Sequence, residues 1–370
     1  MAATRILLAA LALPGLAQSE NAPEQASISI RHLDYKDSQP NLDRIHVRSP
    51  SLEIAVPVAG EWLLRGGAVV DSISGASPRY HTAVSGASRF IEKRKGVDAS
   101  ATRYFKRSSV TVGAGYSGEH DYVSRFVSAQ ASWSSEDNNT TWLIGTGVSN
   151  DRINPVNDAV ENEHKRVRDY MVGVTRVLTP ADIVQLVLTH VRGRGYYSMP
   201  YKYLDQRPRK QEQNSALLRW NHHFSGSGLT SRSSYRYYTD AFGITAHTLA
   251  GELVHPLPGG WTLTPSLRLH SQSAAHFYFD PVYDTRFGPP FPPGFSFADA
   301  RDITADQRLS AYGAVTAGIK IEKELGANTV VDLKLEQYKQ RGQWRVFGTG
   351  SPGLQAFSAR SIQAGVTHRW

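Results

Sequence analysis

The feature that most constrains the fold of this chain is the alternation of apolar and polar residues along most of its length. Within residues 52–58 every even position is apolar, and most even positions of residues 62–70 are apolar as well. The same pattern recurs at residues 110–116 and 331–336. A period of two is typical of β-strands with one apolar face, whereas amphipathic helices repeat about every 3.6 residues. The alternation predicts an all-β fold.

The chain also lacks a segment that could cross a membrane as a helix. No stretch after residue 17 is apolar over the roughly 20 residues that such a helix needs. A closed barrel is the other structure that pairs every backbone N–H and C=O group within lipid. Because lipid-facing and lumen-facing residues alternate in a barrel, its mean hydropathy can be negative, as it is here. The predicted fold is an antiparallel up-and-down transmembrane β-barrel.

Tight turns alternate with long polar loops, an asymmetry typical of outer-membrane barrels. The tight turns are predicted at residues 58–60, 136–139, 179–182, 225–228, 256–260 and 325–328. The long loops are predicted at residues 150–165, 195–211, 277–307 and 341–359. If residues 27–37 form a strand and another lies near residues 80–94, the count is about 16, and without these two it is about 14. We favour 16, because every long loop then falls on one side.

The N-terminus has the form of a secretory signal peptide. Arg5 precedes an apolar run at residues 6–13, and a small residue stands at Ala17. Cleavage after Ala17 removes residues 1–17 and leaves a short segment, residues 18–26, before the barrel at residues 27–370. The predicted localisation is the outer membrane of a Gram-negative cell.

The C-terminus carries a second export-related pattern. Ile362, Val366 and Trp370 lie on one face of an alternating strand that ends in an aromatic residue. This end resembles the signal that the barrel-assembly machinery reads, although His368 stands where such signals usually carry an aromatic residue. We therefore expect Trp370 to act in assembly, with outer-membrane lipid and the assembly machinery as partners.

Composition excludes several kinds of site. The chain has no cysteine, which rules out a disulfide scaffold, a thiolate metal site and a Cys nucleophile. The net charge of +8 comes from Lys and Arg scattered along the chain, so nucleic acid is not an expected partner. Residues 113–118 match a dinucleotide-binding string, but no helix follows them. No metal-ligand spacing and no nucleophile elbow is present, so no catalytic residue, metal or cofactor is predicted.

Charges on the proposed inward faces predict the character of the lumen. The basic candidates are Arg65, Arg219, Arg232, Arg236, Arg268, Lys320 and Lys334. The acidic candidates are Asp71, Glu322, Asp332 and Glu336. An excess of fixed positive charge raises the local concentration of anions, so an open lumen is expected to favour them.

Two motifs resemble a known family. Residues 71–78 (DSISGASP) and residues 116–124 (YSGEHDYVS) are similar to recurrent elements of the uncharacterised Gram-negative family called domain of unknown function 3570. The resemblance implies an outer-membrane barrel but transfers no activity. The motif candidates are Asp71, Ser72, Ser74, Gly75, Ser77, Pro78, Glu119, Asp121 and Tyr122. Gly, Ser, Asp and Pro are turn formers, so a structural role in shaping loops is favoured.

Three functions remain open at this point. A barrel of about 16 strands is wide enough for an aqueous lumen, so passive passage of small solutes is the leading hypothesis. The alternative is a non-enzymatic scaffold or assembly partner for another exported protein, since residues 277–307 gather aromatic side chains among prolines. A hydrolase at the barrel rim is the third and least favoured hypothesis, and the chain is predicted not to be an enzyme.

Overall fold

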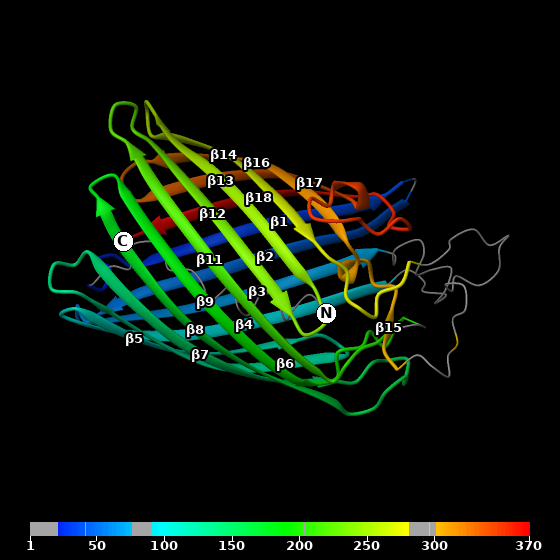
Figure 1. Cartoon of the computed structure of the whole chain (residues 1–370). Coiled ribbons are helices and arrows are strands. Elements are labelled where there is room, and N and C mark those ends of the chain that lie inside the picture. Colours follow the sequence, from blue (N-terminus) through cyan, green and yellow to red (C-terminus); the bar gives the residue numbers. More distant parts are fainter. Residues whose placement is uncertain (1–20, 41, 76–89, 203–204, 281–295, 297–300) are drawn as a thin grey trace.

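The computed structural model describes residues 21–40, 42–75, 90–202, 205–280, 296 and 301–370. Within these residues sixteen antiparallel strands form one closed barrel (Figure 1). The predicted all-β up-and-down barrel with about 16 strands is confirmed. The predicted signal peptide lies outside the described residues.

Each barrel strand pairs with the barrel strand before and after it in the chain, and the first pairs with the last. The barrel strands are β1 (Ser27–Gln39), β2 (Leu42–Val58), β3 (Trp62–Gly75), β4 (Phe90–Phe105), β5 (Ser108–Gly118), β6 (Tyr122–Ser134), β7 (Thr140–Ile153), β8 (Glu163–Thr179), β9 (Asp182–Gly195), β11 (Lys210–Phe224), β12 (Leu229–Asp240), β13 (Thr245–Leu257), β14 (Trp261–Gln272), β16 (Tyr312–Leu325), β17 (Thr329–Arg341) and β18 (Phe357–Arg369). Two short strands, β10 (Asp205–Gln206) and β15 (Ile303–Thr304), form a separate pair. None of the helical turns in the described residues is long or apolar enough to span a membrane.

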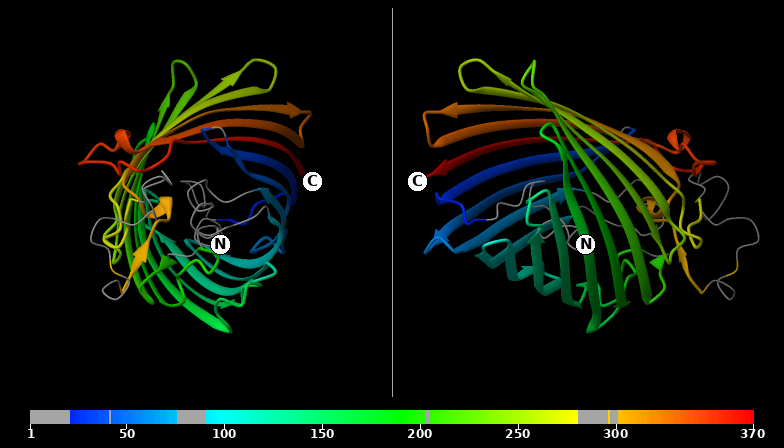
Figure 2. Two further views of the ribbon diagram at one scale, coloured as in Figure 1. Left: turned by 90° about the vertical axis from the view of Figure 1, so that its right-hand side faces the viewer. Right: turned by 60° about the vertical axis from the view of Figure 1, so that its left-hand side comes forward.

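The two ends of the barrel differ. All six predicted tight turns lie at one end, here called the turn end, where Ala26 and Trp370 also exchange two backbone hydrogen bonds. At Ala59 and Gly60 the backbone adopts positive φ, which closes the turn between β2 and β3. All four predicted long loops lie at the opposite end, the loop end, which faces the viewer on the left of Figure 2.

The N-terminal third departs from the prediction. β1 covers the predicted strand at residues 27–37, but the strand expected near residues 80–94 is β4, which starts at Phe90 and ends at Phe105. Residues 80–89 lie outside the described residues. A seventh tight turn at the turn end, between β4 and β5, was also missed. The outer face of β4 carries Lys93 and Lys95 beside small residues, so its sequence lacks a continuous apolar stripe.

Alternation places apolar side chains on the outside of the barrel. Leu333 on β17 is 40% exposed and is in register with Ile321 of β16, which is also exposed. Lys334, the next residue, points to the inside, as does Lys320 opposite it. The same parity holds on the other strands, so exposed apolar side chains form a band around the outer wall.

Tryptophans mark one boundary of this apolar band. Six of the seven tryptophans of the chain are exposed near the turn end. The guanidinium of Arg103 lies over the rings of Trp62 and Phe105, at 5.5 and 4.9 Å from their centroids. Such girdles form where side chains meet the boundary between lipid and water. The tryptophans are Trp62, Trp133, Trp142, Trp220, Trp261 and Trp370.

Candidate functional site

The inside of the barrel is the first candidate site, and its most prominent feature is a group of arginines on three strands. Arg219 comes from β11, Arg232 and Arg236 from β12, and Arg268 from β14. Their register partners show that all four point inward, opposite to the apolar band. Arg219 donates a hydrogen bond to Gln185 at 2.6 Å, whereas the other three are exposed. We call these four residues the arginine wall.

Two carboxylates lie on the other side of the lumen. In the ring of sixteen strands, seven strands separate β12 from β3 in either direction. Glu53 of β2 and Asp98 of β4 flank Gly67 of β3, and both carboxylates point inward and are exposed. A Cβ at Gly67 would lie 2.6 Å from Oδ1 of Asp98, so the glycine leaves the space that this carboxylate occupies. The arginine wall therefore faces a carboxylate pair across the lumen, although Arg65 also projects from β3.

The remaining predicted lumen charges are largely paired. The Nζ atom of Lys320 lies 2.6 Å from Glu322, and that of Lys334 lies 3.0 Å from Glu336, each pair on one strand. Asp332 points inward and is buried. These pairs cancel locally. In the arginine wall, Arg232 is in register with Glu252 of β13, which also points inward.

The acidic candidates predicted from sequence omitted Glu53, Asp98 and Glu252, which all point inward. Glu53 stands within an otherwise apolar run, and Asp98 lies on the strand that was misplaced. Parity on β4 identifies Asp98 once the strand bounds are known, so the signal was present in the sequence.

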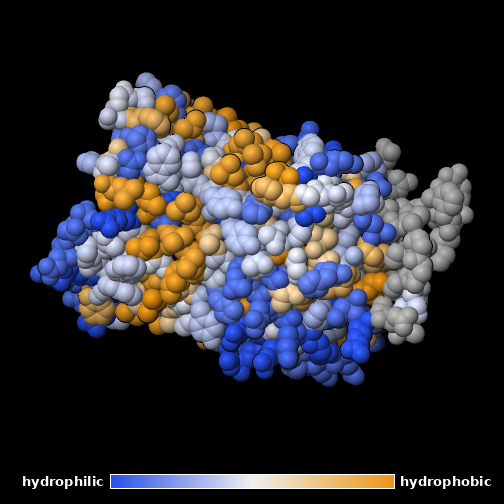
Figure 3. Space-filling model, viewed as in Figure 1, coloured by the Kyte–Doolittle hydropathy of each residue, from blue (hydrophilic) through white to orange (hydrophobic). Residues whose placement is uncertain are grey.

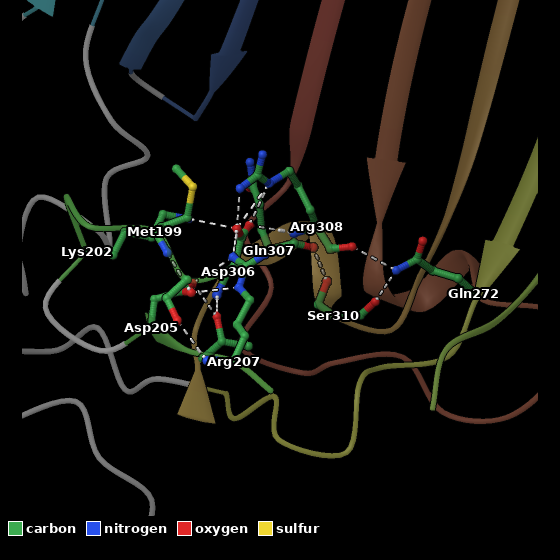
Figure 4. A network of polar contacts seen from close by, with 11 residues as sticks. Met199, Lys202, Asp205, Arg207, Gln272, Asp306, Gln307, Arg308 and Ser310 are labelled. Carbon is green, nitrogen blue, oxygen red and sulfur yellow. Dashed lines mark hydrogen bonds and ion pairs between the residues drawn. The ribbon is translucent and has the colours of Figure 1, made fainter. Parts of the chain in front are cut away.

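A second candidate site is a buried ion cluster at the loop end (Figure 4). The loop between β9 and β11 meets the loop between β14 and β16 where β10 pairs with β15. Asp306 is only 1% exposed. It accepts a hydrogen bond from Arg207 at 2.7 Å and lies 3.1 Å from the Nζ atom of Lys202. Arg308 also pairs with it, and Arg207 donates to Asp205 at 2.6 Å. We call these five residues the loop ion cluster.

The charges of the loop ion cluster stabilise one another. Burial alone would raise the pKa of Asp306, but Arg308, Lys202 and Arg207 together hold that pKa well below its usual range. Burial lowers the pKa of Lys202 to about 8, against the opposing effect of Asp306. The cluster ties two loops that are far apart in sequence into one unit.

Acid is expected to loosen this contact. Because the pKa of Asp306 is depressed in the folded protein, its charge stabilises the contact at pH values above 3.8, and this contribution is lost as the pH falls further. Amide exchange at residues 196–202, 205–209 and 301–311, corrected for intrinsic rates, should accelerate below about pH 4 relative to the barrel strands. Equal protection of these loops at pH 6 and at pH 2.5 would contradict this prediction.

The described residues of the first family motif point to different sides of the barrel wall. Asp71 forms a buried ion pair with Arg94 of β4, whose Nε donates to it at 2.6 Å. Ser72 and Ser74 lie on the opposite face of β3, and Gly75 ends that strand. Two further candidates, Ser77 and Pro78, lie outside the described residues.

Two residues of the second family motif belong to a separate polar cluster. Tyr122 and Ser124 of β6 both donate hydrogen bonds to the buried carboxylate of Asp151 on β7, the second at 2.7 Å. Lys165 of β8 lies 3.1 Å from the same carboxylate and 5.2 Å from the centre of the Tyr122 ring. Each of these groups has a partner within the wall, as in a structural network.

The other motif candidates lie at the turn between β5 and β6. The backbone N–H of Glu119 donates to the carbonyl of Tyr122 at 2.7 Å. Asp121 accepts a hydrogen bond at 2.6 Å from Tyr201, in the loop between β9 and β11. The two motifs therefore do not meet in a single site, and their roles in function stay predictions.

The described residues hold no group of three or more His, Asp or Glu side chains placed to bind a metal ion. Sequence reasoning did not find Asp151, Lys165, Asp205 or Asp306. Trp370 stacks beside His368, with 6.2 Å between the ring centroids, and its role in assembly stays a prediction.

A closed antiparallel barrel with an outer apolar band, a tryptophan girdle and a charged interior defines a membrane protein of the outer-membrane type. A family model matches residues 82–164 and 157–361. The chain belongs to that family, which is described as a protein of unknown function (DUF3570).

Comparison with solved structures finds matches at low sequence identity, and those with a TM-score of at least 0.50 share the fold. A bacterial polysaccharide outer membrane secretin is 9% identical with a TM-score of 0.54, and the match covers 95% of this chain and 100% of that one. CdiB from Acinetobacter baumannii is 8% identical with a TM-score of 0.50, over 91% of this chain and 60% of CdiB. OccK1 from Pseudomonas aeruginosa is 8% identical with a TM-score of 0.47, over 94% and 98% of the chains. No curated protein matches the sequence.

Proposed function

We propose that this protein is a passive, non-enzymatic channel for small anionic solutes in the outer membrane. The observation that carries the proposal is the arginine wall, in which three guanidinium groups are exposed on the inside of a sixteen-stranded barrel. Barrels with 16 to 18 strands enclose an aqueous channel in porins. Exposed guanidinium groups on the inner wall fit a lumen filled with water, because burying a charge in a dry interior is costly.

Charge separation across the lumen gives the proposed channel its preference for anions. The carboxylate pair on β2 and β4 lies away from the arginine wall, so the two do not neutralise each other by contact. Within the low-dielectric wall of a barrel, fixed positive charge concentrates anions and repels cations. The Debye length falls from about 30 Å at 0.01 M salt to about 3 Å at 1 M, so the preference must weaken as salt rises.

Planar bilayer recordings test the proposal. The purified barrel should give discrete conductance steps, with reversal potentials under a salt gradient that indicate anion selectivity. The triple variant Arg232→Gln, Arg236→Gln, Arg268→Gln should lower the anion-to-cation permeability ratio by roughly threefold at low salt. The matched control is Lys36→Gln, Lys339→Gln, Arg360→Gln, which removes the same charge from exposed positions on the outer face of the wall.

Two results would count against this function. Cation selectivity at low salt would contradict the role of the arginine wall. A folded barrel that gives no conductance, and that co-purifies with another exported protein, would instead favour the scaffold hypothesis. The aromatic segment behind that hypothesis, residues 277–307, lies largely outside the described residues.

A further inference from the structure

Basic side chains gather on the outer face of three neighbouring strands at the loop end. All of these side chains are exposed. They belong to Arg166 and Arg168 of β8, Arg192 and Arg194 of β9, and Lys210 of β11. We call these five residues the rim patch. Figure 3 shows polar side chains covering this part of the outer surface, beyond the apolar area.

The rim patch begins where the apolar band ends. On β8 the outward positions between Arg176 and Arg168 are Val174, Val172 and Tyr170. Eight residue steps of about 3.3 Å, tilted by about 40°, span about 20 Å along the barrel axis, close to the apolar height of outer-membrane barrels. On β9, Leu188 belongs to the band and Arg192 lies four residues beyond it. The rim patch therefore lies at the level of lipid headgroups.

Like charges oppose one another in the rim patch. Arg194 is in direct register with Arg166 on one side and with Lys210 on the other. In the next row Arg168 is in register with Arg192. Like charges at directly opposed positions of a sheet are destabilising, so this arrangement favours a bound anion.

Carboxylates compensate little of this charge. Glu212 lies 3.3 Å from Arg192. Among the described residues no carboxylate lies within ion-pair distance of Arg166, Arg168, Arg194 or Lys210. The rim patch thus presents four uncompensated cations at the boundary between lipid and water.

We propose that the rim patch binds the phosphate groups of a phosphorylated glycolipid in the outer leaflet, a proposal that depends on the proposed placement in the outer membrane. Guanidinium groups bind phosphate oxygens in a bidentate manner, and neighbouring strands set several of them at one level. Because the patch continues directly into the apolar band, one ligand with phosphates and acyl chains contacts both surfaces. A soluble phosphate contacts only the rim patch, so the lipid is the occupant that fits both the rim patch and the apolar band.

Native mass spectrometry of the full barrel in detergent tests this inference with diphosphorylated lipid A as the probe. The triple variant Arg166→Gln, Arg168→Gln, Arg194→Gln should bind it at least ~10-fold more weakly than the unmodified protein. The matched control is Arg103→Gln, Arg176→Gln, Lys323→Gln, which removes three outward charges at the turn end. This control should bind lipid A as the unmodified protein does.

Two further binding measurements identify the part of the ligand that the rim patch recognises. Dephosphorylated lipid A should bind the unmodified protein and the rim variant equally weakly, and inorganic phosphate should compete poorly with lipid A. Equal affinity of the rim variant and the unmodified protein for lipid A, or equal loss in the turn-end control, overturns the proposal. Strong competition by inorganic phosphate would show an anion site that does not require lipid. Conductance in bilayers without phosphorylated glycolipid tests the channel separately.

Discussion

Replacing Asp306 with Asn is expected to destabilise the contact between the two loops by about 3–5 kcal/mol, because it leaves buried cations without their shared counterion. Asp306 is buried and interacts with Lys202, Arg207 and Arg308. Asn keeps the size of the side chain but removes its charge. Hydrogen exchange should show loss of protection around β10 and β15 while the barrel strands stay protected.

The control for this prediction is Asp302→Asn, which removes an exposed carboxylate four residues before Asp306 in the sequence. It should leave exchange at β10 and β15 unchanged. If Asp306→Asn also left protection unchanged, the ion cluster would contribute nothing to the loop contact, and hydrogen bonds such as that from Thr304 to Asp205, at 2.8 Å, would have to hold the loops alone.

Leu333→Arg is expected to lower the free energy of unfolding in lipid by about 2–4 kcal/mol, since it places a charge on the lipid-facing side of β17. The adjacent Lys334→Ala faces the lumen and removes a half-exposed ion pair, so its cost should stay within about 1 kcal/mol. Denaturant unfolding from vesicles compares the two variants. Equal stabilities for the two variants would contradict the assignment of Leu333 to the lipid-facing side of β17.

The sequence was sufficient to predict the barrel and the faces of most strands, because alternation is a local property of each strand. On β17 the apolar positions of Leu333 and Leu335 identify the outer face without knowledge of any neighbour. The prediction failed on β4, where charged and small residues break the apolar stripe. A strand without such a stripe is recognised only from the strands that pair with it.

The sites were predicted less well, because they depend on contacts between distant segments. Arg207 and Asp306 are 99 positions apart, and neither loop has a periodic pattern. The candidate Tyr122 was identified by its motif, whereas its partners Asp151 and Lys165 lie on other strands. The position of the arginine wall opposite Glu53 follows from the closure of the ring, which alternation within single strands does not encode.

The pairing of β1 with β18 also sets the order of events when the barrel forms. Ser27 is in register with Arg369, whereas the other ladders of the barrel join strands that follow one another in the chain. Closing so long a loop carries a large entropic cost, and contacts of high sequence separation form slowly. Until this last ladder forms, β1 and β18 each expose an unpaired edge that can pair with another chain. Refolding yield should therefore fall as protein concentration rises, through intermolecular pairing in the interval before closure.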